Sequence, residues 1–175
     1  MSEYAVVEVE AMAVADETMK QLPKGAFLTV KHKKRLNTMT IGWGTIGIVW
    51  AKPVFVAAVR NTRYTYDLIQ REAEFTVSLP NFGTCRQELG FCGTNSGKDV
   101  DKFAKTGLKA RDALKTTTPV IDIPGLHFEC KTLLRAPIAP ELLDSSLADV
   151  YPDADYHTFY FGDIVAAYRL ESQGE

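Results

Sequence analysis

The segment from Arg35 to Thr65, RLNTMTIGWGTIGIVWAKPVFVAAVRNTRYT, decides the predicted fold. It contains two extended segments joined at residues 51–53. The first is rich in glycine and hydroxyl side chains, and the second, residues 54–60, is an almost unbroken apolar strand. Glycine weakens a strand because it loses more backbone entropy than other residues and packs no side chain. The three glycines of the first segment therefore need a structural reason, and close approach of another group is a common one.

Alternate side chains of an extended segment share a face. One face of the first segment would then be mostly main chain: Thr40, Gly42, Gly44 and Ile46. The other face would hold larger side chains: Met39, Ile41, Trp43 and Thr45. A planar aromatic ligand can lie on the bare face and meet peptide N–H groups. The alternative interpretation is that the glycines mark a bulge or a bend at a barrel corner, and this segment alone does not decide between the two.

The bulk composition argues against several classes of function. The 175 residues include 20 Lys and Arg against 22 Asp and Glu, which gives a net charge of −2. The one basic run, residues 31–35, is short and is not interleaved with aromatic residues, so nucleic acid is not an expected partner. The longest apolar run, residues 41–51, is shorter than the roughly 20 residues of a membrane-spanning helix. We expect one domain over residues 1–175, cytoplasmic and without a membrane partner.

Three cysteines, Cys85, Cys92 and Cys130, make an odd number in a chain without a secretory leader. This usage is typical of a reducing compartment, where disulfides are rare. We therefore expect three free thiols.

Hydrophobic periodicity predicts more strands than helices. Strands are expected over residues 4–10, 26–30, 54–60, 74–79, 126–135 and 157–170, the last with a bulge at Gly162. Short helices are expected over residues 63–72 with Thr62 as a possible N-cap, over 84–90, and over 99–105 with Asp99 as N-cap and Gly107 at the end. Several strands, glycine kinks and only short helices favour a mainly β fold, a closed or half-closed β-barrel with peripheral helices.

The acidic residues 136–156 are expected to form a surface loop or an arm on a partner subunit. Asp153, Asp155 and His157 have a spacing that metal ligands can show, but no second ligand cluster accompanies them. We therefore interpret this segment as a solvated loop and expect no metal site. His127, in the strand over 126–135, is expected to be a strand histidine whose ring is hydrogen-bonded.

Residues 91–99, FCGTNSGKD, have the features of an anion-binding loop. Small residues leave backbone N–H groups free, Ser96 adds a hydroxyl and Lys98 adds a charge. The loop is not a P-loop, because Cys92 stands where that motif needs glycine and Asp99 where it needs Ser or Thr. Two interpretations stay open: a phosphate monoester held by Ser96, Gly97 and Lys98, or an ordinary capped turn. The basic run is similarly either a solvated turn or a source of Arg35 or Lys33 for an anionic ligand.

The chain resembles the flavin reductase-like proteins with an FMN-binding split barrel, and among them the flavoredoxin-type members. The resemblance runs from about residue 20 to residue 170. These residues bear it: Asn37–Gly44, Lys52-Pro53, Val59-Arg60, Arg63–Thr65, Phe91–Phe103, His157 and Gly162. It implies a homodimer in which FMN lies against the barrel near the subunit boundary.

The resemblance also implies which residues contact FMN. The isoalloxazine ring would face Asn37, Met39, Thr40, Gly42 and Trp43, with Val59 and Arg60 beside it. The loop Ser96, Gly97, Lys98 and Asp99 would serve the ribityl or phosphate end, where family members commonly have arginine in place of Lys98 and a lysine would bind as a point charge. Arg35, Tyr64, Thr65 and Phe103 complete the predicted cofactor-binding set. His157, near the open flavin face, is the candidate catalytic residue.

Three functional hypotheses follow. The first is an FMN-dependent oxidoreductase that passes hydride or electrons from NADH, NADPH or another donor to an acceptor. No Rossmann site is expected, so a nicotinamide would stack transiently on the flavin. The second is an FMN-binding electron carrier without NAD(P)H-oxidising activity that exchanges electrons with a redox protein. The third is a structural barrel that binds no cofactor.

Overall fold

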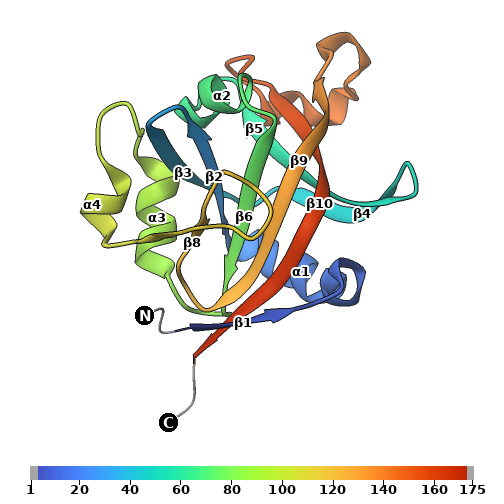
Figure 1. Cartoon of the computed structure of the whole chain (residues 1–175). Helices are drawn as coiled ribbons and strands as arrows, with labels where there is room; N and C mark the ends of the chain where they lie inside the picture. The colour runs from blue at the N-terminus through green and yellow to red at the C-terminus, as the bar shows by residue number, and fades with distance from the viewer. Residues whose placement is uncertain (1–3, 173–175) are drawn as a thin grey trace.

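The computed structural model describes residues 4–172, and its main feature is an antiparallel sheet that curves into a barrel (Figure 1). The strands follow the order β3-β2-β6-β9-β10-β5-β4, and β1 pairs with the C-terminal end of β10. Their bounds are β1 (Tyr4–Glu8), β2 (Ala26–His32), β3 (Arg35–Ile41), β4 (Gly44–Val49), β5 (Lys52–Arg60), β6 (Glu74–Pro80), β9 (Gly125–Pro137) and β10 (His157–Ser172). A separate ribbon pairs β7 (Ala110–Arg111) with β8 (Val120–Ile121).

The sheet closes where β3 meets β4. These strands stand at opposite ends of the strand order, yet only Gly42 and Trp43 separate them in the sequence. The amide of Ala58 in β5 donates to the carbonyl oxygen of Trp43 at 3.2 Å. Large, fully buried side chains belong to the barrel core: Phe55, Phe75, Phe128 and Tyr160. The predicted mainly β barrel with peripheral helices is confirmed.

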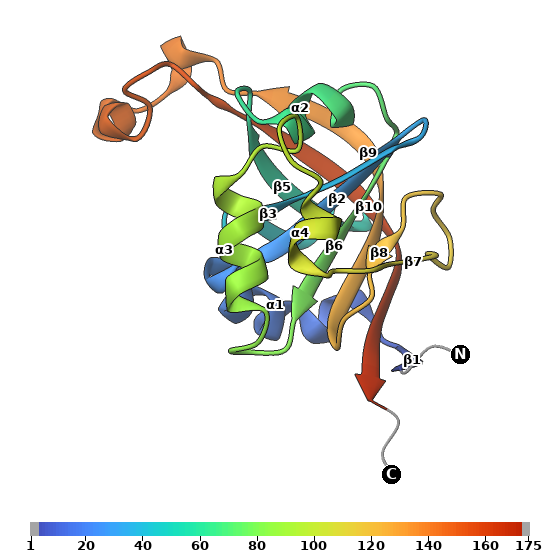
Figure 2. The same ribbon diagram turned by 90° about the vertical axis from the view of Figure 1, so that its left-hand side faces the viewer.

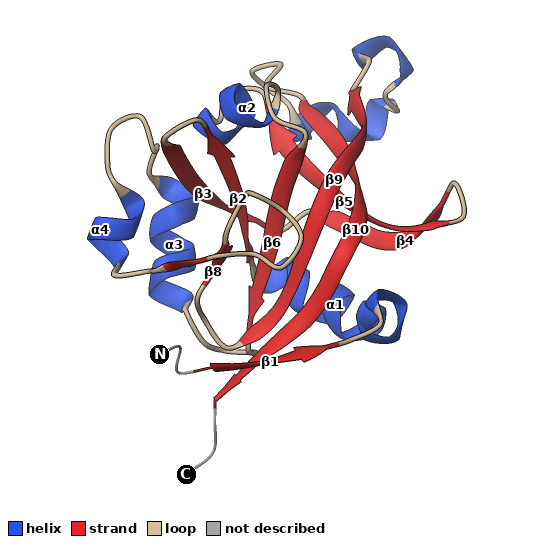
Figure 3. Cartoon of the chain, viewed as in Figure 1, coloured by secondary structure: helices blue, strands red, loops and turns tan. Residues whose placement is uncertain are grey.

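The helices pack outside the barrel (Figure 3). They are α1 (Ala15–Gln21), α2 (Tyr64–Ile69), α3 (Arg86–Thr94) and α4 (Lys102–Thr106). α3 and α4 lie side by side next to β2 and β3 (Figures 1 and 2). An apolar cluster separate from the barrel core forms beneath them: Phe27, Leu89, Cys92, Leu108, Ile121 and Ile123. This packing fixes the loop between α3 and α4 beside β3.

The bulge predicted at Gly162 is present, because the register of β10 against β9 shifts between Phe161 and Gly162. A Cβ atom at Gly162 would lie 2.5 Å from Cζ of Phe75, so close packing against the barrel core requires glycine there. The predicted partners of His127 are also present. Its Nδ1 lies 3.0 Å from the Ser78 hydroxyl and its Nε2 lies 3.0 Å from the carbonyl oxygen of Ile123.

Several predicted boundaries were wrong. α1 was not predicted, although its first turn holds acidic residues and its Lys20 pairs with Asp16. α2 begins at Tyr64 with Arg63, not Thr62, at the N-cap, and has no side-chain cap. α3 continues to Thr94, through half of the predicted loop, because the Thr94 hydroxyl donates to the Gly90 carbonyl at 2.9 Å. Asp101 rather than Asp99 caps α4, accepting from the amide of Ala104.

The predicted two-sided face over residues 39–46 was also wrong. The pleat is interrupted at Gly42 and Trp43, so the alternation of side chains restarts at β4. Ile46 therefore returns to the barrel core together with Met39 and Ile41, while Trp43 is 52% exposed. The bare surface is confined to the point where the two strands meet.

Candidate functional site

Three adjoining hollows line up along β3. The inner hollow has a volume of about 210 Å³ and adjoins the β3–β4 junction. The middle hollow, about 120 Å³, shares Met39, Arg63 and Gly93 with the inner one. The outer hollow, about 770 Å³, shares Asn37, Tyr64, Gly97 and Lys102 with the middle one. Together they form a groove between β3 and the residues of α3, α4 and the loop that joins these helices.

The two glycines at the β3–β4 junction, Gly42 and Gly44, have different structural roles. A Cβ atom at Gly44 would lie 2.4 Å from the carbonyl oxygen of Val56, so barrel packing alone requires glycine at that position. A Cβ atom at Gly42 would meet no atom closer than the Leu22 carbonyl oxygen at 3.8 Å, an ordinary contact. Gly42 instead lines the inner hollow. The barrel-corner interpretation is therefore correct for Gly44, whereas Gly42 presents open main chain to a hollow.

His157, the first residue of β10, is buried at the wall of the inner hollow. Its Nδ1 lies 2.9 Å from the hydroxyl oxygen of Tyr151, and the Trp43 ring lies 4.9 Å from its own ring. Burial, reinforced by the positive charges of Arg60 and Arg63, lowers the pKa of His157 to about 4. The imidazole is therefore neutral at physiological pH. When Tyr151 donates to Nδ1, Nε2 bears the proton and is a hydrogen-bond donor rather than a strong acid.

Arg60 also lines the inner hollow, but its charge is already paired. Its Nη1 lies 2.5 Å from Oδ1 of Asp155, and its Nη2 donates to the Val150 carbonyl oxygen at 3.2 Å. The guanidinium also lies over the Tyr151 ring at 5.2 Å. The hydrogen bond from Arg60 holds the pKa of Asp155 below its ordinary value. Tyr151 and Asp155 thus contact the barrel, so the expectation of a solvated loop was wrong for Asp155, while Pro152, Asp153 and Ala154 are exposed as expected.

Arg63 lies between the inner and middle hollows, and its position contrasts with that of Arg60. It is exposed, and no carboxylate of residues 4–172 forms an ion pair with it. The predicted site residues did not include it. The signal that would have found it is its place at the N-cap of α2, where a side chain is not committed to the helix face.

The middle hollow is rich in hydroxyl groups: Thr62, Thr65, Thr94 and Ser96. The side-chain amide of Asn37 donates to the Thr65 hydroxyl at 2.7 Å, which ties β3 to α2. A Cβ atom at Gly97 would lie only 2.0 Å from Oδ1 of Asn37. Glycine at position 97 is therefore necessary because the loop passes close to β3.

Lys102 forms part of the wall between the middle and outer hollows, and the residue is only 5% exposed. Its ammonium donates to the carbonyl oxygens of Thr38 at 2.9 Å and Cys92 at 2.8 Å. No carboxylate of the described chain pairs with it, and burial lowers its pKa. An ammonium has three hydrogens, so one remains for a further acceptor. Sequence reasoning missed Lys102 because one lysine in a five-residue helix gives no signal of its burial.

Lys98, the lysine that was predicted, is in a different environment. Its Nζ lies 2.9 Å from Oδ2 of Asp67, and both side chains are largely exposed. The ammonium also lies 5.7 Å from the centre of the Tyr64 ring. Tyr64 in turn accepts a hydrogen bond from Nη1 of Arg35 at 2.8 Å. Lys98, Tyr64 and Arg35 belong to the outer hollow, with Asp99 and Phe103.

The structure brings all predicted site residues except Val59 into this groove. The inner hollow holds Met39, Thr40, Gly42, Trp43, Arg60 and His157. The middle hollow adds Asn37, Tyr64, Thr65, Ser96 and Gly97, and the outer hollow adds Arg35, Lys98, Asp99 and Phe103. Val59 is fully buried in the barrel core, since the pleat of β5 turns its side chain inward. The Thr40 hydroxyl donates to the Leu89 carbonyl oxygen at 2.6 Å.

Two negative findings apply to residues 4–172. No group of three or more His, Cys, Asp and Glu side chains is arranged to hold a metal ion. No helix in this range combines the length and the apolar character needed to cross a membrane.

Comparisons with known proteins agree with this geometry. The model of the family described as "Flavin reductase like domain" matches residues 19–175. An uncharacterized protein of Archaeoglobus fulgidus is 26% identical over 111 residues, which are 63% of this chain and 62% of that protein. The matched region thus spans less than two thirds of that relative.

Solved structures share the fold. Flavoredoxin from Methanosarcina acetivorans superposes with a TM-score of 0.66 at 25% identity, over 85% of this chain and 69% of that one. The FMN-binding protein from Thermus thermophilus, solved with bound 1-cyclohex-2-enone, gives a TM-score of 0.63 at 22% identity, over 83% and 69%. The barrel described above is the split barrel of these proteins.

Proposed function

This chain belongs to the flavin reductase-like domain family, and from that membership we propose that it binds FMN along β3 and works as an oxidoreductase. In this proposal hydride or electrons pass from a reduced donor, through FMN, to an acceptor. Flavoredoxin and the FMN-binding protein support the cofactor, because they share the barrel on which the groove is built. When bound, the flavin supplies the hydride and electron transfer.

The observation that bears the proposal is the order of chemical groups along the groove. The inner hollow offers main chain at Gly42, the aromatic Trp43 and the apolar Met39, which suit a flat ring. The middle hollow offers hydroxyls and the cations Arg63 and Lys102, neither paired with a carboxylate in the described chain. A buried cation without a counter-ion is costly, so it indicates an anion that arrives with a ligand.

The residues present therefore fit FMN, with a role for each. Gly42 and Trp43 would hold the ring, and His157 would donate a hydrogen bond to it as a neutral imidazole. Lys102, Arg63 and the hydroxyls of Thr65 and Ser96 would hold the phosphate. The paired Arg60 would contribute less charge than an isolated arginine.

A direct binding experiment tests this assignment. Purified protein freed of flavin is titrated with FMN and with riboflavin, and binding is followed by flavin fluorescence. We expect FMN to bind at least tenfold more tightly, because only FMN has a phosphate for the cations of the middle hollow. Equal affinities would contradict the phosphate assignment, and no binding of either flavin would contradict the proposed function.

A second candidate function, an FMN-dependent electron carrier that does not oxidise NADH or NADPH, is favoured by Trp43. This side chain borders the inner hollow yet is 52% exposed, which suits contact with a redox protein. Anaerobic titration separates the two candidates. Bleaching of the bound flavin by NADH or NADPH supports the oxidoreductase, while bleaching only by a reduced redox protein supports the carrier.

We also propose that the chain works as a homodimer. Exposed apolar side chains on the β4 hairpin support this, since Ile48 is 60% and Trp50 is 58% exposed. Apolar side chains grouped on a protruding hairpin are typical of protein interfaces. Light scattering should give twice the chain mass, and a monomer at micromolar concentration would contradict the proposal.

A further inference from the structure

A further hollow, which we call the α1 hollow, lies away from the groove. It is lined by one face of α1, by residues 79–82 at the end of β6 and by Leu126 of β9, and its volume is about 300 Å³. In Figures 1 and 2, α1 lies beside the C-terminal end of β6. No residue that lines the α1 hollow also lines a hollow of the groove. Its volume is at the lower end of the range for small-molecule sites.

The floor of the α1 hollow is apolar, and its rim is held in place. Leu79 and Leu126 pair across β6 and β9 and are 1% and 2% exposed. In the turn that follows β6, Thr84 donates its amide at 3.0 Å and its hydroxyl at 2.7 Å to the carbonyl oxygen of Asn81. This turn presents Phe82, which lines the hollow and is 74% exposed. An apolar floor with an aromatic ring at its edge suits a small flat group.

Gln21 is the polar residue that indicates a ligand. It lines the α1 hollow and is only 7% exposed, and its buried Oε1 accepts no hydrogen bond from any donor of residues 4–172. A buried acceptor without a donor costs about 1–3 kcal/mol. Thr18, one turn earlier in α1, is also buried, but its hydroxyl donates to the Val14 carbonyl oxygen at 2.8 Å. The unmatched Oε1 therefore suits a donor that arrives with a ligand.

The charges around the α1 hollow cancel in pairs. Nζ of Lys20 lies 2.7 Å from Oδ2 of Asp16, and Glu17 forms an ion pair with Arg169 of β10. A charged ligand would have to break one of these pairs or remain without a counter-ion. A neutral ligand avoids both costs. Because the Gln21 carboxamide has an acceptor and a donor side by side, the matching ligand offers an N–H and a carbonyl oxygen side by side.

We propose that the α1 hollow binds a neutral carboxamide or lactam with a flat apolar body. The ligand N–H donates to Oε1 of Gln21, and the ligand carbonyl oxygen accepts from the side-chain nitrogen of Gln21. The flat body lies on Leu79 and Leu126 beside the Phe82 ring. This site is independent of the proposed function, because it shares no lining residue with the groove.

The test titrates the ¹⁵N-labelled full chain with benzamide and follows the amide resonances by NMR. The side-chain NH₂ resonance of Gln21 is identified by its loss in Gln21→Met. Two reference ligands have the same ring: N,N-dimethylbenzamide has the carbonyl but no N–H, and benzoate has a negative charge and no N–H. We expect benzamide to bind roughly tenfold more tightly than either reference, because neither can donate to Oε1.

Two variants locate the site. Gln21→Met keeps the side chain about the same size but removes both hydrogen-bonding groups, so it should weaken benzamide roughly tenfold. The stability of this variant should be unchanged or higher, because the change removes a buried acceptor without a donor. Phe82→Ala changes an exposed side chain and should weaken benzamide several-fold through lost ring contact.

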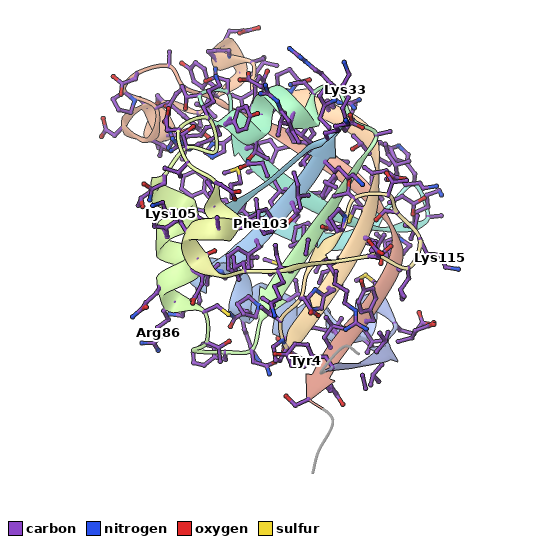
Figure 4. The ribbon with its side chains drawn as sticks, turned by 60° about the vertical axis from the view of Figure 1, so that its left-hand side comes forward. Tyr4, Lys33, Arg86, Phe103, Lys105 and Lys115 are labelled. Atoms are coloured by element: carbon purple, nitrogen blue, oxygen red, sulfur yellow. The ribbon has the colours of Figure 1, made fainter. Side chains whose placement is uncertain are left out.

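The matched control is Gln87→Met, the same change on α3. Gln87 is exposed, lies outside the α1 hollow and follows Arg86, whose side chain extends from the surface at the start of α3 (Figure 4). Its substitution should leave the affinity for benzamide unchanged. Repeating the titration with FMN present shows whether benzamide has entered the groove instead.

Binding of benzamide that shifts the Gln21 side-chain resonance, weakens in Gln21→Met and is unchanged by FMN supports the site. Four results would overturn it. Benzamide does not bind, so that the α1 hollow holds only water; N,N-dimethylbenzamide binds equally well; Gln87→Met weakens benzamide as much as Gln21→Met does; or FMN displaces benzamide, which places benzamide in the groove.

Discussion

Two loops of this protein each lie next to a buried charged side chain, Glu129 in one case and Lys102 in the other, and the two side chains have opposite environments. The loop over residues 112–118 covers Glu129 of β9, which is fully buried. Its carboxylate accepts the amides of Leu114, Lys115 and Thr116 at 2.6 to 2.9 Å, and the Tyr168 hydroxyl at 2.9 Å. The loop over residues 95–101 leads into Lys102, whose ammonium donates to two carbonyl oxygens and, within the described part of the chain, to no carboxylate.

The difference separates a structural charge from a functional one. The chain supplies Glu129 with a full set of donors, so its burial stabilises the loop that surrounds it. Among residues 4–172, no carboxylate pairs with Lys102, which lines two hollows. A buried charge that the protein does not neutralise marks a ligand site, and variants of the two charges and of their surroundings test this contrast.

The largest expected effect is on stability, at Glu129. Glu129→Leu leaves three amides and a tyrosine hydroxyl without their acceptor, and should lower the free energy of unfolding by about 2–4 kcal/mol. Urea denaturation measures it, and the FMN affinity should not change. The matched control is Glu74→Leu, because the half-exposed Glu74 carboxylate accepts from Thr117 of the same loop at 2.8 Å. Equal losses for both variants would show that burial of Glu129 adds nothing.

The next effect is on binding, at Lys102. Lys102→Met removes an unpaired buried cation, so stability should stay within about 1 kcal/mol or rise, because burying such a charge is unfavourable. The affinity for FMN should fall by roughly 10- to 100-fold, and that for riboflavin by much less. Lys98→Met should cost less than about threefold, since Lys98 is exposed and paired with Asp67. Losing stability but not FMN affinity would make Lys102 a structural residue.

The two lysines show what the sequence could predict about the site. Pattern and resemblance selected residues that, apart from Val59, all line the groove, because those residues sit at strand and loop positions with recognisable spacing. They selected Lys98 over Lys102, since residue type and spacing do not reveal burial or counter-ions. Lys102 is buried because its ammonium reaches the carbonyl oxygen of Thr38 in β3, a tertiary contact between residues 64 positions apart in the sequence.

The fold, like the site, was predicted correctly in outline but not in every detail. The alternation of apolar residues predicted the strands and therefore the barrel. The break of the pleat at Gly42 and Trp43 was not predictable, because it results from barrel closure against β5 rather than from local preference. The same limit explains Val59, whose direction depends on the register of β5 in the closed sheet. Arg63 was read as part of a motif, but only the structure shows that it lacks the partner that Arg60 has.

A smaller effect is expected where the 95–101 loop touches β3. Gly97→Ala places a methyl group 2.0 Å from Oδ1 of Asn37, so the loop must move away from the strand. We expect a loss of about 1–2 kcal/mol in stability and several-fold weaker FMN binding, measured by urea denaturation and flavin fluorescence. Gly90→Ala is the control, since a Cβ atom there meets nothing within 4 Å and alanine favours the helix. If both variants are equally stable, the loop is not held against Asn37.

The smallest effect is on the flavin midpoint potential. It concerns Arg60, the cation of the groove that is paired with a carboxylate, Asp155. Asp155→Asn leaves Arg60 without a carboxylate partner at the wall of the inner hollow. Arg60 then resembles Lys102, which has no carboxylate partner among the described residues at the wall of the middle hollow. An unpaired positive charge favours the reduced, more negative flavin, so the potential should rise, on the order of 30 mV or about 1.4 kcal/mol for two electrons. Anaerobic redox titration measures it. The control is Asp163→Asn, which removes the carboxylate partner of Lys52 outside the hollows and should leave the potential unchanged. A rise of equal size in both variants would mean that only the net charge of the protein matters, and that the position of Asp155 does not.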